Sequence, residues 1–136
     1  MQHLDSILVL DFGSQYTQLI ARRVRELHVY CEIHPYSHWE KAIKLLKPKG
    51  IILSGSPASV EAHGAPLIEK NIVDGRIPIL GICYGMQLLT KLFGGRVGKA
   101  QKKEYGRATI TADNTNLVFS GLEVEQTVWM SHGDRI

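Results

Sequence analysis

The chain has few cysteines and no long apolar run, and both features limit the classes of protein to which it can belong. The only cysteines among its 136 residues are Cys31 and Cys83, and they lack the spacing of metal ligands. No apolar stretch reaches the roughly 20 residues that cross a bilayer. The first residues also lack the basic and apolar pattern of a signal peptide. We therefore expect a cytoplasmic protein with no membrane contact, no bound metal and no disulfide.

Clustered positive charge is missing as well. The chain has 16 Lys and Arg against 13 Asp and Glu, a formal net charge of +3. Basic residues adjoin only in short groups such as Arg22-Arg23 and Lys102-Lys103. A nucleic-acid surface needs longer basic clusters with interleaved aromatic residues, whereas a pair such as Arg22-Arg23 is typical of a solvated helix face. We expect no nucleic-acid partner.

The sequence alternates between strand and helix patterns. Short apolar runs typical of buried strands lie at residues 6–12, 29–33, 50–53 and 77–82. Helical patterns lie at residues 15–27, 37–47, 66–74 and 84–93. Ser37 and Glu40 predict a capping box at the start of the second helix, and Pro48 predicts its end. This alternation predicts an α/β fold with a mostly parallel central sheet and helices on both faces.

The pattern changes after Gly95. Alternating residues at 107–112 predict a half-exposed strand, and residues 113–116 predict a turn. Residues 126–130 predict a further strand that ends at residues 131–134. A length of 136 residues suits one compact domain, so we assign residues 1–136 to a single domain.

Three polar or glycine-rich motifs follow predicted strands. They are Gly13-Ser14-Gln15, the loop from Ser54 to Pro57, and the segment from Gly81 to Gly85. Ligands of parallel α/β sheets bind at the carboxyl ends of the strands. The sequence therefore predicts that the three motifs form one pocket.

The segment Gly81-Ile82-Cys83-Tyr84-Gly85 has the pattern of a nucleophile elbow, with Cys in place of Ser. Glycines are needed on both sides because a side chain there would collide with the neighbouring strand or helix. The start of a helix favours a thiolate, and the Tyr84 N–H would point toward an oxyanion. The alternative is that Cys83 is a small buried hydrophobe. Cys31 lies within a predicted strand, and we expect it to be structural.

The residues also resemble a known family. GICYGMQ (81–87) resembles the nucleophile motif of class I, triad-type glutamine amidotransferases, and ILSGSP (52–57) resembles their oxyanion loop. LDFGSQYTQLIARRVREL (10–27) and VWMSHGD (128–134) are similar to the amidotransferase domains of GMP synthetases. The resemblance covers nearly the whole chain. It implies a flavodoxin-like sheet of that family, truncated here at its C-terminal side.

The resemblance implies a reaction at Cys83. The thiolate would attack the side-chain carboxamide of glutamine, release ammonia and form a glutamyl thioester that water hydrolyses. The oxyanion would be held by the N–H of Tyr84 and by an N–H of Gly55 or Ser56. The glutamine pocket would be lined by Gln87, Ser131, His132, Gly133 and Asp134. The alternatives are a solvated helix position for Gln87 and a plain turn for residues 131–134.

The resemblance also implies partners. In the family, ammonia passes to an ATP-pyrophosphatase (synthetase) domain, in the same or a partner chain, which aminates xanthosine monophosphate (XMP) to GMP. We expect no cofactor in the amidotransferase domain, ATP and Mg²⁺ in the synthetase domain, and a homodimer of the full-length protein. We also expect the synthetase partner to switch on glutamine hydrolysis.

The chain departs from the family at three places. The family's catalytic His-x-Glu would lie beyond Ile136. His38-Trp39-Glu40 spells the same pattern but precedes the nucleophile, and His132 matches the substrate segment instead. Ser56 stands where the family usually has a second glycine, and a serine suffices there if its φ is negative or is strained by the turn. His28 stands where a glycine is frequent, just after a helix.

Other assignments fit the sequence less well. Asp11-Phe12-Gly13 spells a kinase metal motif, but no glycine-rich loop or catalytic loop accompanies it. Residues 54–56 resemble the start of a pyrophosphate loop, but Pro57 removes an N–H that a phosphate would need. The open alternatives are another class I amidotransferase, such as those of anthranilate or carbamoyl phosphate synthesis, and a non-catalytic module of the same fold.

Overall fold

The structure is a computed structural model that describes residues 4–74 and 76–135, with side chains described outside 100–104 and 130–135. The chain divides into two compact units, one up to Gly98 and one from Lys99 to Arg135. Each unit is described by itself, and the assignment of residues 1–136 to a single domain stays a prediction. Among the helices of the described residues, none has the length and apolar character to cross a bilayer.

The first unit is built on a parallel sheet of four strands. They are β1 (Ser6–Asp11), β2 (Tyr30–Pro35), β3 (Gly50–Leu53) and β4 (Ile79–Gly81), in the order β2-β1-β3-β4. Leu10 of β1 lies opposite Leu53 of β3, which lies opposite Gly81 of β4. Because the strands are parallel and end in register, the loops that follow β1, β3 and β4 start side by side.

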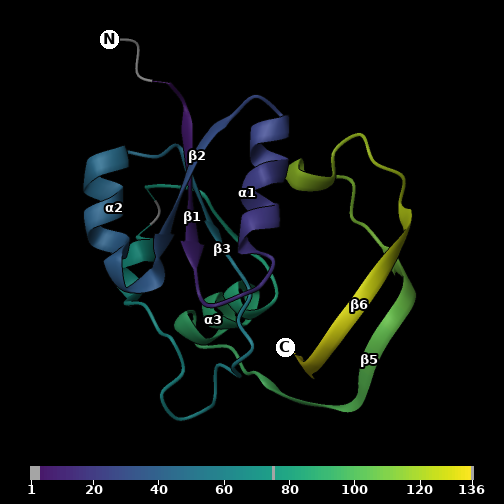
Figure 1. The fold of residues 1–136 in the computed structure, drawn as a ribbon. Coiled ribbons are helices and arrows are strands. Elements are labelled where there is room, and N and C mark those ends of the chain that lie inside the picture. The colour runs from purple at the N-terminus through teal and green to yellow at the C-terminus, as the bar shows by residue number, and fades with distance from the viewer. Residues whose placement is uncertain (1–3, 75, 136) are drawn as a thin grey trace. The chain divides into compact units, whose positions relative to one another are not determined.

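Helices cover both faces of this sheet, as the sequence predicts. Figure 1 shows α1 (Thr17–Glu26) and α2 (Trp39–Leu46) on opposite sides of the strands. Ala21 of α1 packs with Val9 and Cys31 on one face, while Ala42 of α2 and Leu88 of α3 (Tyr84–Leu92) join the cluster on the other. The α/β fold with a parallel central sheet is therefore confirmed.

The apolar run of β1 follows from this two-sided cover. Leu8, Val9 and Leu10 are all fully buried, although successive side chains point to opposite faces. A strand buried on both faces requires consecutive apolar residues rather than alternation. Each fully buried leucine contributes about 1.5–3 kcal/mol to folding, so the burial of Leu8 and Leu10 stabilises the sheet.

The capping box predicted at Ser37 and Glu40 is wrong. A 3₁₀ turn, η1 (Tyr36–His38), precedes α2, and the N-cap residue is His38 with no side-chain cap bond. Ser37 lies inside this turn, where its hydroxyl is not at the cap position. The predicted end is right, because Lys47 takes a left-handed conformation with φ of 49° and Pro48 follows.

The helix predicted over residues 66–74 is also wrong. Only a 3₁₀ turn, η2 (Lys70–Val73), forms in this segment. The carbonyl of Pro66 accepts a hydrogen bond from the Tyr84 hydroxyl instead of a helical amide. Ile68 and Ile72 are buried in the core on the α2 and α3 side. Tertiary contacts therefore keep residues 66–74 irregular, although the local sequence pattern favours a helix.

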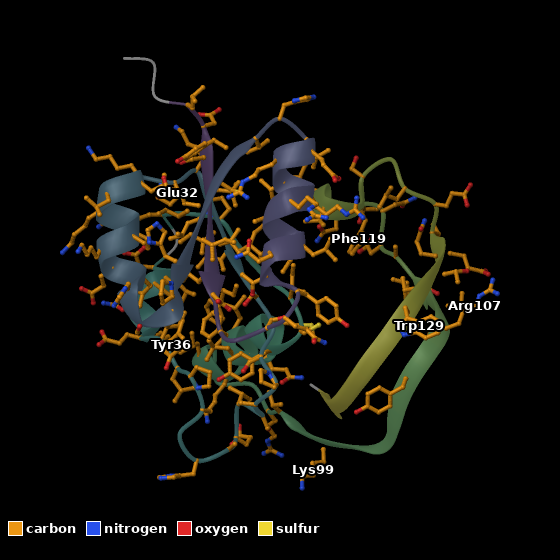
Figure 2. The ribbon with its side chains drawn as sticks, viewed as in Figure 1. Glu32, Tyr36, Lys99, Arg107, Phe119 and Trp129 are labelled. Atoms are coloured by element: carbon orange, nitrogen blue, oxygen red, sulfur yellow. The ribbon has the colours of Figure 1, made fainter. Side chains whose placement is uncertain are left out.

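The second unit contains β5 (Gly98–Thr111) except for its first residue, η3 (Leu117–Phe119) and β6 (Glu125–Arg135), and β5 pairs with β6. The predicted turn after β5 is confirmed, because the Asp113 carboxylate accepts from the Thr115 N–H at 3.0 Å. Figure 2 shows Arg107 on β5 and Trp129 on β6, and both side chains are exposed. Both strands are longer than the predicted ones, and β6 continues through residues 131–134.

A strained residue at the end of α1 gives a test of this fold. His28 has φ of 61° just after the helix, a conformation in which glycine is preferred. We predict that His28→Gly raises the free energy of unfolding by about 0.5–1 kcal/mol, measured by urea denaturation. The control Arg22→Gly, at an exposed position inside α1, should lower it by about 1 kcal/mol. Lower stability of His28→Gly would contradict the left-handed assignment.

Candidate active site

Three loops meet at the carboxyl edge of the parallel sheet, as the sequence predicts. A Cβ built on Gly55 would lie 3.6 Å from the Cβ of Cys83 and 3.4 Å from the Oγ of Ser14. These residues follow β3, β4 and β1, whose ends are in register. The structure therefore brings the thiol, the loop after β3 and the loop after β1 into contact.

Cys83 occupies a strained turn between β4 and α3. Its backbone has φ of 53° and ψ of −111°, and its side chain is exposed. Such a conformation costs a non-glycine residue on the order of 1–3 kcal/mol, and it is concentrated at functional sites. The alternative that Cys83 is a buried hydrophobe is wrong. Cys31 is the buried cysteine, and its thiol donates to the Ala21 carbonyl at 3.4 Å.

The two flanking glycines are required by contact. A Cβ on Gly81 would stand 2.7 Å from the carbonyl oxygen of Gly85. A Cβ on Gly85 would overlap the carbonyl oxygen of Leu53, and the Gly85 N–H donates to the Ser54 carbonyl at 3.2 Å. The first turn of α3 therefore lies directly against the end of β3, which is possible only without side chains at these two positions.

Backbone N–H groups lie near the thiol. Within the described residues, the N–H groups of Gly55, Ser56 and Tyr84 donate to no acceptor. Tyr84 is the first residue of α3, and the Gln87 N–H donates to the Cys83 carbonyl at 3.1 Å. Unpaired N–H groups at a helix start attract negative charge. The surroundings of Cys83 therefore suit an oxyanion.

Ser56 occupies the loop after β3 without backbone strain, at the position where the resemblance implies a glycine. The non-glycine residues with positive φ in the described chain are His28, Lys47 and Cys83, so Ser56 is not strained. Its Oγ accepts from the Ala58 N–H at 3.2 Å and stabilises the turn after the loop. The backbone N–H of Ser56 remains available whether the residue is Gly or Ser.

The Asp11-Phe12-Gly13 segment is a structural turn. The Asp11 carboxylate accepts from the Gly13 N–H at 2.8 Å and from the Thr17 hydroxyl at 3.0 Å. Gly13 has φ of 95°, and a Cβ there would lie 3.8 Å from Pro57. The carboxylate thus joins the end of β1 to the start of α1, and the glycine allows the loop after β3 to approach.

The side chain of Tyr84 has a structural role that the sequence analysis missed. It is 2% exposed, and its hydroxyl donates to the Pro66 carbonyl at 2.5 Å. Its ring lies 5.6 Å from that of Phe12, which stacks on Tyr36 at 5.3 Å. Burial, and secondarily the nearby Tyr36, raise the pKa of Tyr84 to about 12. The available signal was the spacing of Tyr84 and Leu88, which places both on one face of the helix.

Gln87 lies inward on α3. It is only 9% exposed, so the alternative of a solvated helix position is wrong. Within the described residues, its side-chain amide has no hydrogen-bond partner. Its place in a glutamine pocket stays a prediction.

Residues 131–134 lie in β6, so the alternative of a plain turn is wrong. The side chains of Ser131, His132 and Asp134, like the surroundings of Gly133, lie outside the described residues. Their assignment to the substrate pocket therefore stays a prediction.

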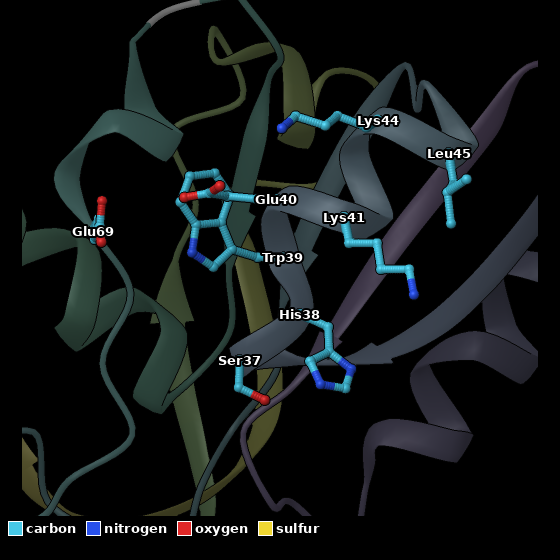
Figure 3. A pocket seen from close by; sticks show the side chains of 8 residues that line it. All are labelled: Ser37, His38, Trp39, Glu40, Lys41, Lys44, Leu45 and Glu69. Carbon is cyan, nitrogen blue, oxygen red and sulfur yellow. The ribbon is translucent and has the colours of Figure 1, made fainter.

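A separate hollow of about 590 Å³ lies along α2 and contains none of the predicted site residues. It is lined by Ser37, His38, Trp39, Glu40, Lys41, Lys44, Leu45 and Glu69. Figure 3 shows the side chains of His38 and Glu40 pointing in different directions. The pattern His38-Trp39-Glu40 therefore does not form a catalytic pair. Within the described residues, no group of three metal-ligating side chains is arranged around a common point.

The contact between α3 and β3 leads to a stability prediction. Gly85→Ala should lower the free energy of unfolding by about 1–3 kcal/mol, because its Cβ would push α3 away from Leu53. Gly98→Ala is the matched control, since a Cβ there meets nothing within 4 Å. It should change stability by less than about 0.5 kcal/mol in the same urea titration. Equal effects of the two substitutions would refute this account of the elbow.

The Tyr84 hydroxyl leads to a second prediction. Tyr84→Phe should lower stability by about 1–3 kcal/mol near neutral pH, because the Pro66 carbonyl loses its donor. The control Tyr16→Phe, at an exposed ring, should stay within about 0.5 kcal/mol.

The pH dependence of this effect has a fixed sign. Tyr84 ionises near pH 10 when unfolded but near pH 12 when folded, so the folded state binds more protons between these values. The stabilisation by Tyr84 is complete below pH 10 and is lost as pH rises toward 12. The difference in free energy of unfolding between wild type and Tyr84→Phe should therefore be smaller at about pH 11 than at about pH 8. A gap that widens would contradict the raised pKa.

The chain is similar to known proteins over almost its whole length. The family model for class I glutamine amidotransferases matches residues 8–136. A GMP synthase [glutamine-hydrolyzing] of Heliobacterium modesticaldum is 56% identical over 97% of this chain, and one of Bacillus cereus is 53% identical over 99%. The chain spans 26% of the length of each of these relatives.

Solved structures share the fold. A Thermoplasma acidophilum protein, described as a candidate GMP synthase subunit, is 33% identical with a TM-score of 0.83. The match covers 98% of this chain and 67% of that one. A Thermotoga maritima glutamine amidotransferase is 23% identical, with a TM-score of 0.73 over 98% of this chain and 63% of its own. The chain belongs to the class I glutamine amidotransferase family.

Proposed function

We propose that this chain is the glutaminase part of a GMP synthase and that Cys83 is its nucleophile. The observation that carries the proposal is the geometry of Cys83, an exposed thiol on a strained turn at the start of α3. The N–H groups of Tyr84 and of the loop at Gly55, which donate to no acceptor in the described part of the chain, lie beside it. The names of relatives more than 50% identical support the same assignment.

The chemistry follows from these groups. The Cys83 thiolate adds to the side-chain carboxamide carbon of glutamine, and the carbonyl oxygen becomes an oxyanion that accepts from the N–H groups of Tyr84 and Ser56. The C–N bond then breaks, the nitrogen takes up a proton and ammonia leaves. Water adds to the resulting thioester, the C–S bond breaks, and glutamate and the free thiol are released. Gln87 and Ser131, His132, Gly133 and Asp134 bind the substrate.

The leaving nitrogen must receive a proton from a side chain that acts as general base and then as general acid. None of the residues assigned above supplies such a side chain. We assign it to a His-x-Glu pair in a part of the full-length protein outside this chain. The ammonia would serve the ATP- and Mg²⁺-dependent amination of XMP to GMP, in a synthetase domain of a homodimeric cytoplasmic enzyme. Binding of the acceptor nucleotide would switch on glutamine hydrolysis.

The decisive experiment labels the thiols. The full-length protein is treated with a glutamine analogue that carries a chloromethyl ketone, and the adduct is mapped by mass spectrometry. We expect labelling at Cys83 that glutamine slows, because the analogue and glutamine compete for one pocket. Cys31 is the internal control, since it is buried and should stay unmodified. Cys83→Ser should abolish both labelling and ammonia release.

The other outcomes separate the alternatives. Labelling of Cys31 alone, or of neither cysteine, would favour a non-catalytic module. Glutaminase activity that supports amination of a substrate other than XMP would favour another class I amidotransferase.

A further inference from the structure

Ser54 is a fully buried polar residue that joins three segments of the site. Its N–H donates to the Leu10 carbonyl at 3.1 Å, and its carbonyl accepts from the Gly85 N–H at 3.2 Å. Its hydroxyl accepts from the Phe12 N–H at 3.1 Å and donates to the Gly55 carbonyl at 3.1 Å. A buried serine with every group paired is costly to replace, so its hydroxyl has a definite task.

The bond to the Gly55 carbonyl fixes the orientation of one peptide group. The Gly55 carbonyl and the Ser56 N–H belong to the same planar peptide, in which they point in opposite directions. Holding the carbonyl against the Ser54 hydroxyl therefore turns the Ser56 N–H away from Ser54. Within the described residues this N–H has no acceptor, and the adjacent Gly55 lies against Cys83.

The preceding peptide is fixed in a different way. The Ser54 carbonyl is held by the Gly85 N–H, and this bond orients the Gly55 N–H without help from the serine side chain. Of these two N–H groups, the Ser54 hydroxyl therefore orients only that of Ser56. Its own direction is set because the Phe12 N–H occupies one lone pair, which leaves the Gly55 carbonyl as the acceptor for its proton.

We infer that Ser54 is a positioning residue that aims the Ser56 N–H at the oxyanion formed during attack by Cys83. The inference rests on the proposed function, because an oxyanion donor matters only if Cys83 attacks a carbonyl. In the described residues, the Ser54 hydroxyl is hydrogen-bonded to Phe12 and Gly55 and not to Cys83, so it acts through the Gly55–Ser56 peptide. A misdirected N–H weakens binding of the transition state more than binding of glutamine, so its loss lowers kcat and leaves KM nearly unchanged.

The first test is kinetic and uses the full-length protein. Ser54→Ala should lower kcat for glutamine hydrolysis by roughly tenfold to a hundredfold, since complete loss of one oxyanion donor costs about 10²–10³. KM should change by less than about twofold, because ground-state binding is retained. Ser59→Ala is the matched control, as its Oγ, among the residues that the structure describes, accepts only from the Glu61 N–H at 3.4 Å on the same loop. It should keep the wild-type kcat.

The second test separates aiming from general disruption. A chloromethyl ketone analogue of glutamine reacts with the thiolate through a tetrahedral oxyanion before chloride leaves, whereas iodoacetamide reacts by direct displacement at carbon. Ser54→Ala should slow the labelling of Cys83 by the ketone about tenfold or more and leave its labelling by iodoacetamide unchanged. A mere shift of Cys83 would slow both reactions alike.

Each outcome decides the inference. An unchanged kcat in Ser54→Ala, or equal slowing of both reagents, would overturn it. If Ser54→Ala does not fold, Ser54→Cys replaces the hydroxyl by a thiol, which is a weaker donor and acceptor, and it should lower kcat with KM nearly unchanged. A wild-type kcat in Ser54→Cys would then overturn the inference. A wild-type protein without glutaminase activity and without labelling at Cys83 would instead refute the proposed function.

Discussion

The site depends on the close contact between the first turn of α3 and the end of β3. The Gly85 N–H bonds to the Ser54 carbonyl, and the absence of a Cβ lets the helix backbone touch Leu53. Because of this contact the helix starts immediately beside the loop after β3, so that Gly55 lies against Cys83. A Cβ at position 85 would displace α3 from β3 and so move the thiol away from the N–H groups of the loop after β3.

The strain at Cys83 is sustained by the same contact. A φ of 53° is unfavourable for cysteine, so the flanking segments must hold it. On one side the Ile82 N–H donates to the Leu53 carbonyl at 3.0 Å, and on the other the Gly85 N–H donates to Ser54 and Ile82. These bonds fix the residues before and after the turn, so the residue between them has little freedom. Burial of the strands β1 and β3 contributes the free energy of folding that offsets the strain at Cys83.

Features set by local sequence could be predicted, and those set by tertiary contact could not. The four parallel strands and the elbow at Cys83 follow from apolar runs and from glycine spacing, which the chain itself displays. The predicted helix over residues 66–74 failed because the Tyr84 hydroxyl, 18 residues away, takes the Pro66 carbonyl. The capping box at Ser37 failed because a 3₁₀ turn shifts the N-cap to His38.

The positioning role of Ser54 was hidden for a related reason. Its hydroxyl partner Phe12 lies 42 residues earlier in the chain, and no local pattern connects them. The sequence analysis placed Gly55 and Ser56 in the loop near the thiol, but it had no signal for what orients their peptide groups. Motifs identify the groups that take part in chemistry, whereas long-range hydrogen bonds determine where these groups point.

The glycines of the family pattern serve different physical purposes, and the departures in this chain separate them. Ser56 has no positive φ, so a side chain is accommodated there without backbone strain. His28 has φ of 61°, so the absence of glycine there has a cost in stability. Gly85 cannot be replaced without overlap, whereas a methyl group on Gly55 would meet only ordinary contacts at 3.4 and 3.6 Å. That methyl group would lie beside Cys83 and Ser14, so a side chain at position 55 changes the surroundings of the thiol more than it changes the fold.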